Sequence, residues 1–335
     1  MLAVVAGLLA IADGPSAPVS SRARLADALF VRVQAGTGLG ELTVASGDVW
    51  ANDYGREELV RLDGGSGRVI ARLPLGRRVA LAGSGDDVWA LRWGGRSFRW
   101  PNGPLFRVDP ATNRVTARIP LREPSGEPVT GFGVLADEDD VWVWGPSRVL
   151  RLDPSSGRVV RVHAPRTGGV ELTGAVLHAG GLLAVTAEGG LVRIDRRGGV
   201  RRAAPVPALA TAELVAATGD SVLAVVDGTL IAADVTTGRV RWRRPLGFRV
   251  STVVESGGIL LAHGGALGDP GDRVWAVEPA SGRVLASAVV PSFGTTSMVS
   301  SGGSLWLATS AGEVVVVPRA LTRLFQRRAV REIRG

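Results

Sequence analysis

The sequence predicts an all-β protein, a seven-bladed β-propeller of four-stranded antiparallel blades that is closed into a ring by an N-terminal strand. Two repeated patterns in the 335 residues support this fold: a turn motif around an acidic residue and a short apolar strand centred on Val-Trp or a similar pair. Composition is the third observation, because 46 glycines and 19 prolines divide a chain that is 45% hydrophobic into short elements.

The turn motif occurs six times, and its valine recurs at intervals of 46, 44, 41, 40 and 44 residues, which is the period of a propeller blade. In each copy an acidic residue ends a strand and can cap the turn, and Gly or Asn takes the left-handed position. The copies are RLDGGSGRV (Asp63), RVDPATNRV (Asp109), RLDPSSGRV (Asp153), RIDRRGGV (Asp195), AADVTTGRV (Asp234) and AVEPASGRV (Glu278). We expect turn chemistry here and not a ring of acidic ligands, so Asp109→Ala should weaken folding slightly and leave binding unchanged.

The apolar strand occurs seven times and gives the number of blades. Each copy is entered from Gly, Asp or Ser, and the copies are centred on Trp50, Trp89, Trp142, Leu183, Leu223, Leu260 and Trp306. A residue that recurs at one position of a blade is usually part of the core between blades, so we expect the four tryptophans of this set to be buried there.

Blade seven departs from the pattern and indicates how the ring closes. Val317 stands where the acidic residue should be and Arg323 where the valine should be, so the last strand of this blade is missing from its own repeat. The segment 28–34 (ALFVRVQ) has strand character and precedes the first blade. We expect it to be the outer strand of blade seven, which gives a propeller over residues 28–318 without exposed sheet ends.

The two ends of the chain indicate a location outside the cytoplasm, secreted or membrane-anchored. Residues 1–27 begin with an apolar run, Leu2 to Ala12, that is too short to span a bilayer but suits a signal peptide, or an anchor whose start lies upstream; the alternative is a frayed tail. Residues 319–335 predict a basic amphipathic helix that contacts an anionic membrane or partner, or else docks on the last blade.

The charge is basic but not concentrated. The net charge is +8, and all 39 basic residues are arginines, scattered through every segment. No nucleic-acid-reading motif accompanies them, so we expect no nucleic-acid partner. We also expect the chain to be a monomer. The absence of lysine excludes Schiff-base chemistry, and the absence of cysteine excludes disulfides and thiol catalysis.

One stretch, DGTLIAADVTTGRVRWRRPLG (227–247), has the spacing A-x-D-x-x-T-G-R-x-x-W and resembles the tryptophan-docking repeat of the pyrroloquinoline quinone (PQQ) enzymes. The repeats as a set resemble the PQQ-like and YVTN-type repeat propellers, over about residues 28–318. PQQ dehydrogenases are typically eight-bladed and longer, with a vicinal disulfide and a calcium-bound carboxylate, whereas this chain has no cysteine and one full copy of the docking motif. We therefore expect no cofactor, and expect Trp242 to pack one blade against the next.

An Arg-Trp-rich insertion, residues 92–104, follows the second strand of blade two, on the face where propellers usually bind ligands. Arginine and tryptophan can stack on planar or anionic ligands, although the loop can also fold over its own aromatics. A second insertion in blade six, residues 263–273, carries Asp269 and Asp272, for which a solvated turn is favoured over a calcium site; we expect no metal. The candidate ligand-binding residues are Arg92, Trp93, Arg96, Trp100, Trp144 and His263.

The repeat is also similar to that of streptogramin B lyases, seven-bladed propellers that use histidines from neighbouring blades, a glutamate and magnesium. This resemblance implies His263 and Glu278 as weak catalytic candidates, but blade five has Val226-Asp227 where the second histidine should be. His163 and His178 are expected to face away from the channel. The favoured function is a non-catalytic binding or interaction scaffold for a protein or small ligand; a lyase is the alternative, and a PQQ-dependent oxidoreductase ranks below it.

Overall fold

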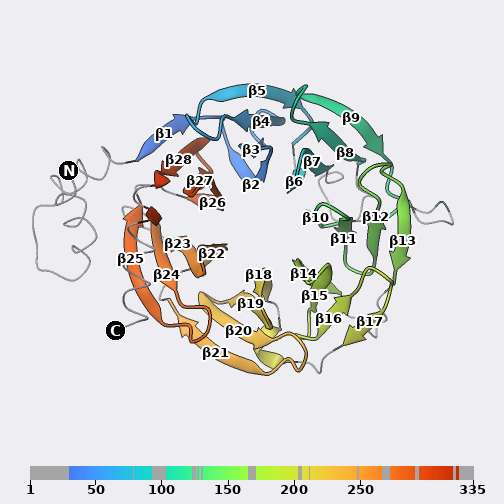
Figure 1. The fold of residues 1–335 in the computed structure, drawn as a ribbon, viewed down its shortest axis with the longest axis vertical. Coiled ribbons are helices and arrows are strands. Elements are labelled where there is room, and N and C mark those ends of the chain that lie inside the picture. Colours follow the sequence, from blue (N-terminus) through green and yellow to red (C-terminus); the bar gives the residue numbers. More distant parts are fainter. Residues whose placement is uncertain are drawn as a thin grey trace, which may run out of the picture.

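Seven four-stranded antiparallel sheets surround one axis, as predicted (Figure 1). The computed structural model describes residues 30–77, 79–92, 103–122, 126, 128–129, 131–164, 171–202, 206–210, 212–246, 249–265, 272–290, 294–319 and 322–323. In six sheets the strands follow one another outward from the axis in chain order. Blade 7 differs, because its outermost strand comes from the N-terminal side of the chain.

The strands of blades 1 to 3 are β2 (Leu39–Ala45), β3 (Asp48–Asp53), β4 (Glu58–Leu62) and β5 (Val69–Pro74); β6 (Val79–Ser84), β7 (Asp87–Arg92), β8 (Leu105–Asp109) and β9 (Arg114–Ile119); and β10 (Gly133–Ala136), β11 (Val141–Trp144), β12 (Val149–Leu152) and β13 (Val159–His163). Those of blades 4 and 5 are β14 (Leu172–His178), β15 (Gly181–Thr186), β16 (Leu191–Ile194) and β17 (Val200–Arg202); and β18 (Glu213–Thr218), β19 (Ser221–Val226), β20 (Thr229–Asp234) and β21 (Val240–Pro245).

Blade 6 contains β22 (Arg249–Ser256), β23 (Ile259–Gly265), β24 (Asp272–Val277) and β25 (Val284–Val290). Blade 7 contains β26 (Thr295–Ser301), β27 (Ser304–Thr309), β28 (Glu313–Val317) and β1 (Val31–Gln34). A short 3₁₀ helix, η2 (Pro207–Leu209), lies in the connection between blades 4 and 5.

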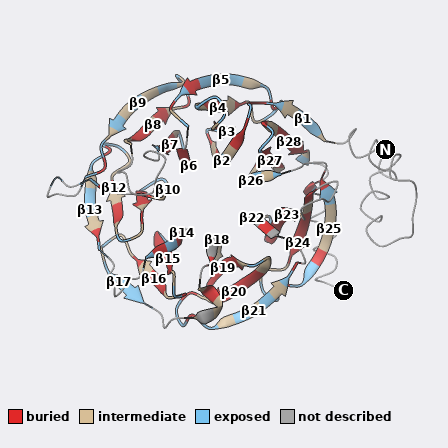
Figure 2. Ribbon diagram, turned by 180° about the vertical axis from the view of Figure 1, so that it is seen from behind, coloured by how far each residue is buried: buried red, intermediate tan, exposed pale blue. Residues whose placement is uncertain are grey.

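The core of the described chain lies between the blades. Its buried apolar residues form seven clusters, one at each interface between neighbouring blades. The middle strands of the blades are mostly buried, whereas the outer strands alternate with exposed positions (Figure 2). The recurring tryptophans Trp50, Trp89, Trp142 and Trp306 are at most 1% exposed, which confirms their predicted place in the core. Burial of apolar area therefore stabilises the ring mainly through contacts between blades.

The ring closes through the predicted N-terminal strand. β1 pairs antiparallel with β28, with Val31 opposite Val316 and Gln34 opposite Glu313. The next two residues continue the contact, because the N–H groups of Ala35 and Gly36 both donate to the Gly312 carbonyl, at 3.0 and 2.9 Å. β1 thus completes blade 7 and removes the open edge that β28 would otherwise present.

Asp53, at the end of β3, fixes the chain that leads from β1 into blade 1. Its side chain is fully buried, and its carboxylate accepts hydrogen bonds from the N–H groups of Thr37, Gly38, Gly55 and Arg56 at 3.2–3.3 Å. A Cβ at Gly36 would lie 2.4 Å from the Asp53 carboxylate, so only glycine fits there. Buried carboxylates need such donors, and here two of the four, from Thr37 and Gly38, belong to the segment between β1 and blade 1.

The acidic residues of the turn motif cap their own turns, as predicted. Asp109 accepts hydrogen bonds from the Ala111 N–H at 2.8 Å and from Thr112 Oγ1 at 2.7 Å. Equivalent backbone bonds are made by Asp63, Asp153, Asp195 and Asp234. The predicted left-handed residues have positive φ in all six copies: Gly67, Asn113, Gly157, Gly198, Gly238 and Gly282.

Arginines on three third strands bind the next blade. Each donates to the aspartate that opens the second strand of its own blade and to a backbone carbonyl in the turn of the following blade. The sets are Arg61 with Asp48 and Pro110, Arg107 with Asp87 and Ser155, and Arg151 with Asp140 and Arg196. The first two guanidinium groups also lie over the Trp50 and Trp89 rings, at 5.3 and 5.8 Å. These charge-assisted bonds fix the orientation of each blade relative to the next.

Trp242 packs blade 5 against blade 6, as the sequence predicted. Its indole N–H donates to the Pro279 carbonyl at 2.9 Å. A Cβ at Gly282 would lie 2.4 Å from the indole ring, so this turn position has to be glycine for steric reasons as well as for its φ of 70°. The docking motif therefore serves the packing of blades in this chain.

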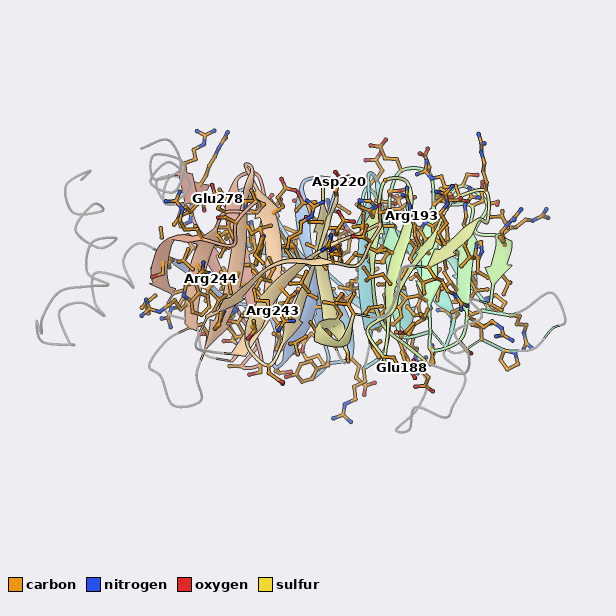
Figure 3. The ribbon with its side chains drawn as sticks, turned by 90° about the horizontal axis from the view of Figure 1, so that it is seen from below. Glu188, Arg193, Asp220, Arg243, Arg244 and Glu278 are labelled. Carbon is orange, nitrogen blue, oxygen red and sulfur yellow. The ribbon has the colours of Figure 1, made fainter. Side chains whose placement is uncertain are left out.

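The alternation of strand directions gives the ring two different faces. One, here called the turn face, carries the turns between first and second strands and between third and fourth strands. The other, the loop face, carries the connections between second and third strands and those between blades. In Figure 3, Asp220 and Glu278 lie toward the turn face and Glu188 toward the loop face. Both predicted insertions, after β7 and after β23, join second strands to third strands and belong to the loop face.

The two terminal segments lie largely outside the described residues, which include none of residues 1–27. At the other end Arg319, Thr322 and Arg323 are helical. Thr322 is 1% exposed, and its hydroxyl donates to the Val317 carbonyl at 3.3 Å, so the start of this helix docks on β28. In the part of the chain that the structure describes, no helix has the length and hydropathy needed to cross a bilayer.

Ser84→Ala tests the hydrogen bonding of the tryptophan core. Ser84 Oγ accepts the Trp89 indole N–H at 3.2 Å, whereas the indole N–H groups of Trp50, Trp142 and Trp306 have no partner among the described residues. Removing this acceptor should cost about 1–3 kcal/mol of unfolding free energy, measured by denaturant titration. The matched variant Ala45→Ser places a hydroxyl near Trp50 and should raise stability. Equal stability of Ser84→Ala and wild type would contradict this role.

Candidate functional site

The candidate site is on the loop face, where second strands end. Of the six predicted ligand-binding residues, Arg92, Trp144 and His263 are described, whereas Trp93, Arg96 and Trp100 lie outside the described residues. Arg92 ends β7 and Trp144 ends β11, so both stand at the loop face, in the neighbouring blades 2 and 3. Both residues are thus on the loop face, but Arg92 lies beside Gly76 in the connection between blades 1 and 2, whereas Trp144 packs against the cluster between blades 3 and 4.

Arg92 is exposed, and two glycines hold its side chain. A Cβ at Gly76 would lie 2.9 Å from Arg92 Nε, and one at Gly103 would lie 3.0 Å from Arg92 Cδ. Gly76 also has a φ of 104°, which favours glycine on its own. The guanidinium atoms Nε and Cζ are the ones nearest to this Gly76 position, so the group lies against the connection between blades 1 and 2 and would lose less conformational freedom on binding.

Trp144 is half-buried and packs against the segment that enters blade 3. Phe132 meets its indole edge to face, with ring centroids 6.0 Å apart and planes at 89°. A Cβ at Gly133 would lie 2.5 Å from Trp144 Nε1, so glycine allows the ring to lie flat on the strand. The result is a fixed aromatic surface with one part open to solvent, which is the kind of surface that binds planar groups.

His263, a candidate ligand-binding residue from the sequence, is near the loop-face end of β23 but is buried. Its side chain is 1% exposed, and Nε2 lies 3.4 Å from Asp272 Oδ2. The same carboxylate oxygen accepts the Thr295 hydroxyl at 2.6 Å and its backbone N–H at 3.2 Å. Because Thr295 begins β26, this group joins blade 6 to blade 7. The carboxylate of Asp272 compensates for the loss of water around the His263 imidazole, so this side chain can be buried.

Asp272 is the partner of His263, and the sequence did not reveal this pairing. The sequence analysis considered Asp272 only as a calcium ligand. Burial alone would raise the pKa of its carboxyl, but the hydrogen bonds from His263 and Thr295 outweigh burial and lower the pKa to about 2. The other proposed calcium ligand, Asp269, lies outside the described residues. Within the described ranges, no three His, Asp or Glu side chains are arranged to hold a metal ion.

Glu278 does not join His263. β24 ends at Val277, one residue before Glu278, which caps the turn that follows: it accepts a hydrogen bond from the Ser281 hydroxyl, and its carbonyl accepts the Gly282 N–H. His263 pairs with Val274, near the loop-face end of the same strand, whereas Glu278 is on the turn face (Figure 3). The two residues named by the lyase resemblance therefore lie toward opposite faces of blade 6.

The other two histidines are also separate from each other and from His263. His163 ends β13, is 5% exposed and stacks on Trp142 with centroids 6.0 Å apart; desolvation by burial lowers its pKa. His178 ends β14 on the turn face, where Nε2 lies 2.8 Å from the Gly219 carbonyl. Each histidine thus belongs to a different blade and a different environment.

Glu41 is a further titratable group on the innermost strand of blade 1. Its Oε2 accepts the Leu81 N–H of the neighbouring inner strand at 2.8 Å. Desolvation within the ring raises the pKa of Glu41 above its ordinary value, and the hydrogen bond from Leu81 lowers it. Asn52 makes a parallel contact by donating to the Val79 carbonyl at 3.3 Å. These two side chains satisfy the free backbone edge of β6.

Asp272→Asn should lower stability at neutral pH, and the loss should shrink in acid. The folded-state pKa of about 2 is below the ordinary 3.8, so the charged carboxylate stabilises the fold above pH 3.8 and loses this effect as the pH falls through 2. Denaturant midpoints at neutral pH and at these two limits measure the window. Glu255→Gln, an exposed carboxylate in the same blade, is the control. A difference between wild type and Asp272→Asn that does not change with pH would contradict the assignment.

Comparisons with known proteins identify the fold and no specific family. No family model and no curated protein matches the chain. Similar solved structures include BamB from Moraxella catarrhalis, with 18% identity, a TM-score of 0.53 and coverage of 83% of this chain and 84% of that one. A streptogramin B lyase has 15% identity, a TM-score of 0.66 and coverage of 86% and 97%. The WD40 repeats of RRP9 have 10% identity, a TM-score of 0.68 and coverage of 87% and 97%. At such identities the likeness extends to the seven-bladed propeller fold alone.

Proposed function

We propose that this chain is a non-catalytic binding scaffold that takes a partner or small ligand at the loop face, beside Arg92 and Trp144. One observation carries the proposal: an exposed guanidinium group and a half-buried indole, each next to a glycine, stand at the loop-face ends of second strands in adjacent blades. Functional residues on a rigid scaffold commonly stand at such strand ends and in the loops that follow them.

The chemistry of these two side chains favours a planar or anionic ligand. A guanidinium group presents a fork of donors that matches a carboxylate or phosphate, and an indole face offers apolar contact and attraction to cations. A ligand or partner segment that contacts both has to extend across blades 2 and 3, because Arg92 lies toward blade 1 and Trp144 toward blade 4. An acidic, aromatic segment of a partner protein presents the same chemistry, so the proposal covers a small ligand and a protein loop.

The arrangement of the described histidines supports a scaffold more than an enzyme. His263 is buried against Asp272, Glu278 caps a distant turn, and His163 and His178 belong to other blades. The fold itself does not decide, because it is shared by a lyase and by WD40-repeat proteins. The alternative, a streptogramin-lyase-like enzyme, would be supported by magnesium-dependent opening of a cyclic depsipeptide lactone.

Fluorescence titration with anilinonaphthalene sulfonate, a planar aromatic anion, tests the loop-face site. Arg92→Ala and Trp144→Ala should each weaken binding by about tenfold, the effect of losing one charge-assisted or stacking contact. Arg118→Ala is the matched control, because Arg118 is an exposed arginine over the Phe106 ring on the outer wall. Equal losses in all three variants, or none in the first two, would overturn the proposed site.

We extend the proposal to location: the chain functions outside the cytoplasm. The support is the apolar run of residues 2–12, which suits an export signal or an anchor. A fusion to alkaline phosphatase, which is active only after export, should show enzyme activity in cells. An inactive alkaline phosphatase fusion, together with an active fusion to a reporter that works only in the cytoplasm, would contradict this location.

A further inference from the structure

The outer wall of the ring has a charge of one sign. The fourth strands of the seven blades carry ten arginines and no aspartate or glutamate: VRVQ, VIARLP, RVTARI, VVRVH, VRR, VRWRRP and VLASAVV. Charged residues on edge strands prevent pairing with other chains, so a general excess of arginine needs no further function. The distribution of the unpaired arginines, however, is uneven.

Blade 4 keeps an arginine of the inter-blade set without its acidic partner. Arg193 occupies on β16 the position of Arg61, Arg107 and Arg151, but Gly181 stands where those blades have an aspartate at the start of the second strand. Arg193 is directly opposite Arg201 of β17, as Arg151 is opposite Arg161 in blade 3, but Arg151 has Asp140 as a partner. Like charges directly opposite each other on paired strands are destabilising, so this pair has a cost that folding of the blade alone does not explain.

Five exposed arginines of blades 3 and 4 form one surface, here called the arginine surface: Arg158, Arg161, Arg197, Arg201 and Arg202. The two blades adjoin there, because Arg161 Nη1 donates to the Arg197 carbonyl at 2.9 Å. Residues 153–163 and 191–202 contain seven arginines (two and five) and two aspartates. Both aspartates, Asp153 and Asp195, cap their own turns, and Arg196 pairs with Asp137, Asp139 and Asp140. The excess of positive charge is therefore carried by the five exposed arginines.

Exposed aliphatic residues lie among these arginines. Val160 precedes Arg161 on β13 and is 50% exposed, and Val200 precedes Arg201 on β17 and is 42% exposed. Phe, Tyr and Trp are absent from β13, from β17 and from the turns before them, and His163 at the end of β13 is buried. A surface for nucleic acid commonly adds aromatic rings that stack on bases, whereas arginine beside short aliphatic groups suits the boundary between lipid headgroups and acyl chains.

We propose that the arginine surface binds the anionic headgroups of a lipid bilayer. Arginine forks bind phosphate oxygens in pairs, and each basic residue near an anionic membrane adds to the attraction. Val160 and Val200 enter the interface beside them. This surface lies on the outer wall and the ligand site on the loop face, so the inference is independent of the proposed function and leaves Arg92 and Trp144 accessible.

The test is co-sedimentation of the full chain with vesicles of phosphatidylcholine and phosphatidylglycerol in equal amounts. Replacing both Arg201 and Arg202 by glutamine should lower the partition coefficient about 30-fold, since each arginine contributes a factor of about five. The matched control is the double variant Arg114→Gln and Arg118→Gln, which removes the same charge from β9 of blade 2 and should change binding less than about threefold. Melting temperatures no lower than that of wild type show that the variants are folded; the β17 variant should melt slightly higher, because it removes the charge opposite Arg193.

Three outcomes would overturn the proposal. The first is an equal loss of binding in the two double variants, which would show that net charge alone attracts the vesicles. The second is equally tight binding to vesicles of phosphatidylcholine alone. The third is binding of duplex DNA that is as tight as binding of the vesicles and is reduced as much by the β17 double variant. This result would show a general polyanion site. Val200→Ser separates these further, because it should weaken vesicle binding a few-fold and leave DNA binding unchanged.

Discussion

Pairing of β1 with β28 joins the two ends of the ring, and every other interface of the molecule depends on it. Each hydrophobic cluster lies between two neighbouring blades, so a blade is stable only when both of its sides are covered. Without β1, blade 7 would lose its outer strand and expose the edge of β28. Asp53 strengthens this closure because its buried carboxylate holds the backbone of Thr37 and Gly38 directly after β1.

The closed ring separates structural and binding roles between its two faces. On the turn face, aspartates cap their turns and the arginines Arg61, Arg107 and Arg151 bind the carbonyls of the next blade, so the polar groups there are largely engaged. On the loop face, strand ends differ from blade to blade: Asp53 is buried in a closure contact, whereas Arg92 is exposed. Variation at equivalent positions on a rigid frame is how such folds acquire different ligands.

Features of the fold that repeat could be predicted from the sequence. The period of about 40 residues gave the blades, the turn motif gave the caps at Asp109 and its equivalents, and the missing acidic residue at Val317 indicated strand donation by residues near 28–34. The docking of Trp242 on blade 6 also followed from its motif. Each of these patterns is local in sequence and recurs, so several copies support one interpretation.

Contacts made once, between distant residues, could not be predicted. The distance between His263 and Asp272 depends on how β23 pairs with β24, and the sequence analysis instead considered His263 with Glu278 across the length of the strand. The Asp53 contact depends on the path of the chain between blades 7 and 1. Arg61 has an acidic partner, Asp48, whereas the residue at the equivalent position for Arg193 is Gly181. This equivalence becomes clear only once the register of the paired strands is known.

Hydrogen–deuterium exchange of wild type and Asp53→Asn tests most directly whether the closure supports the whole ring. An asparagine side chain offers one acceptor oxygen and turns two donors toward the N–H groups that Asp53 holds. If closure is the common support, exchange should rise in β1 and β28 and, to a comparable degree, in the inner strands of all seven blades. Faster exchange confined to Thr37, Gly38 and the adjacent turn, with β1 still protected, would contradict it.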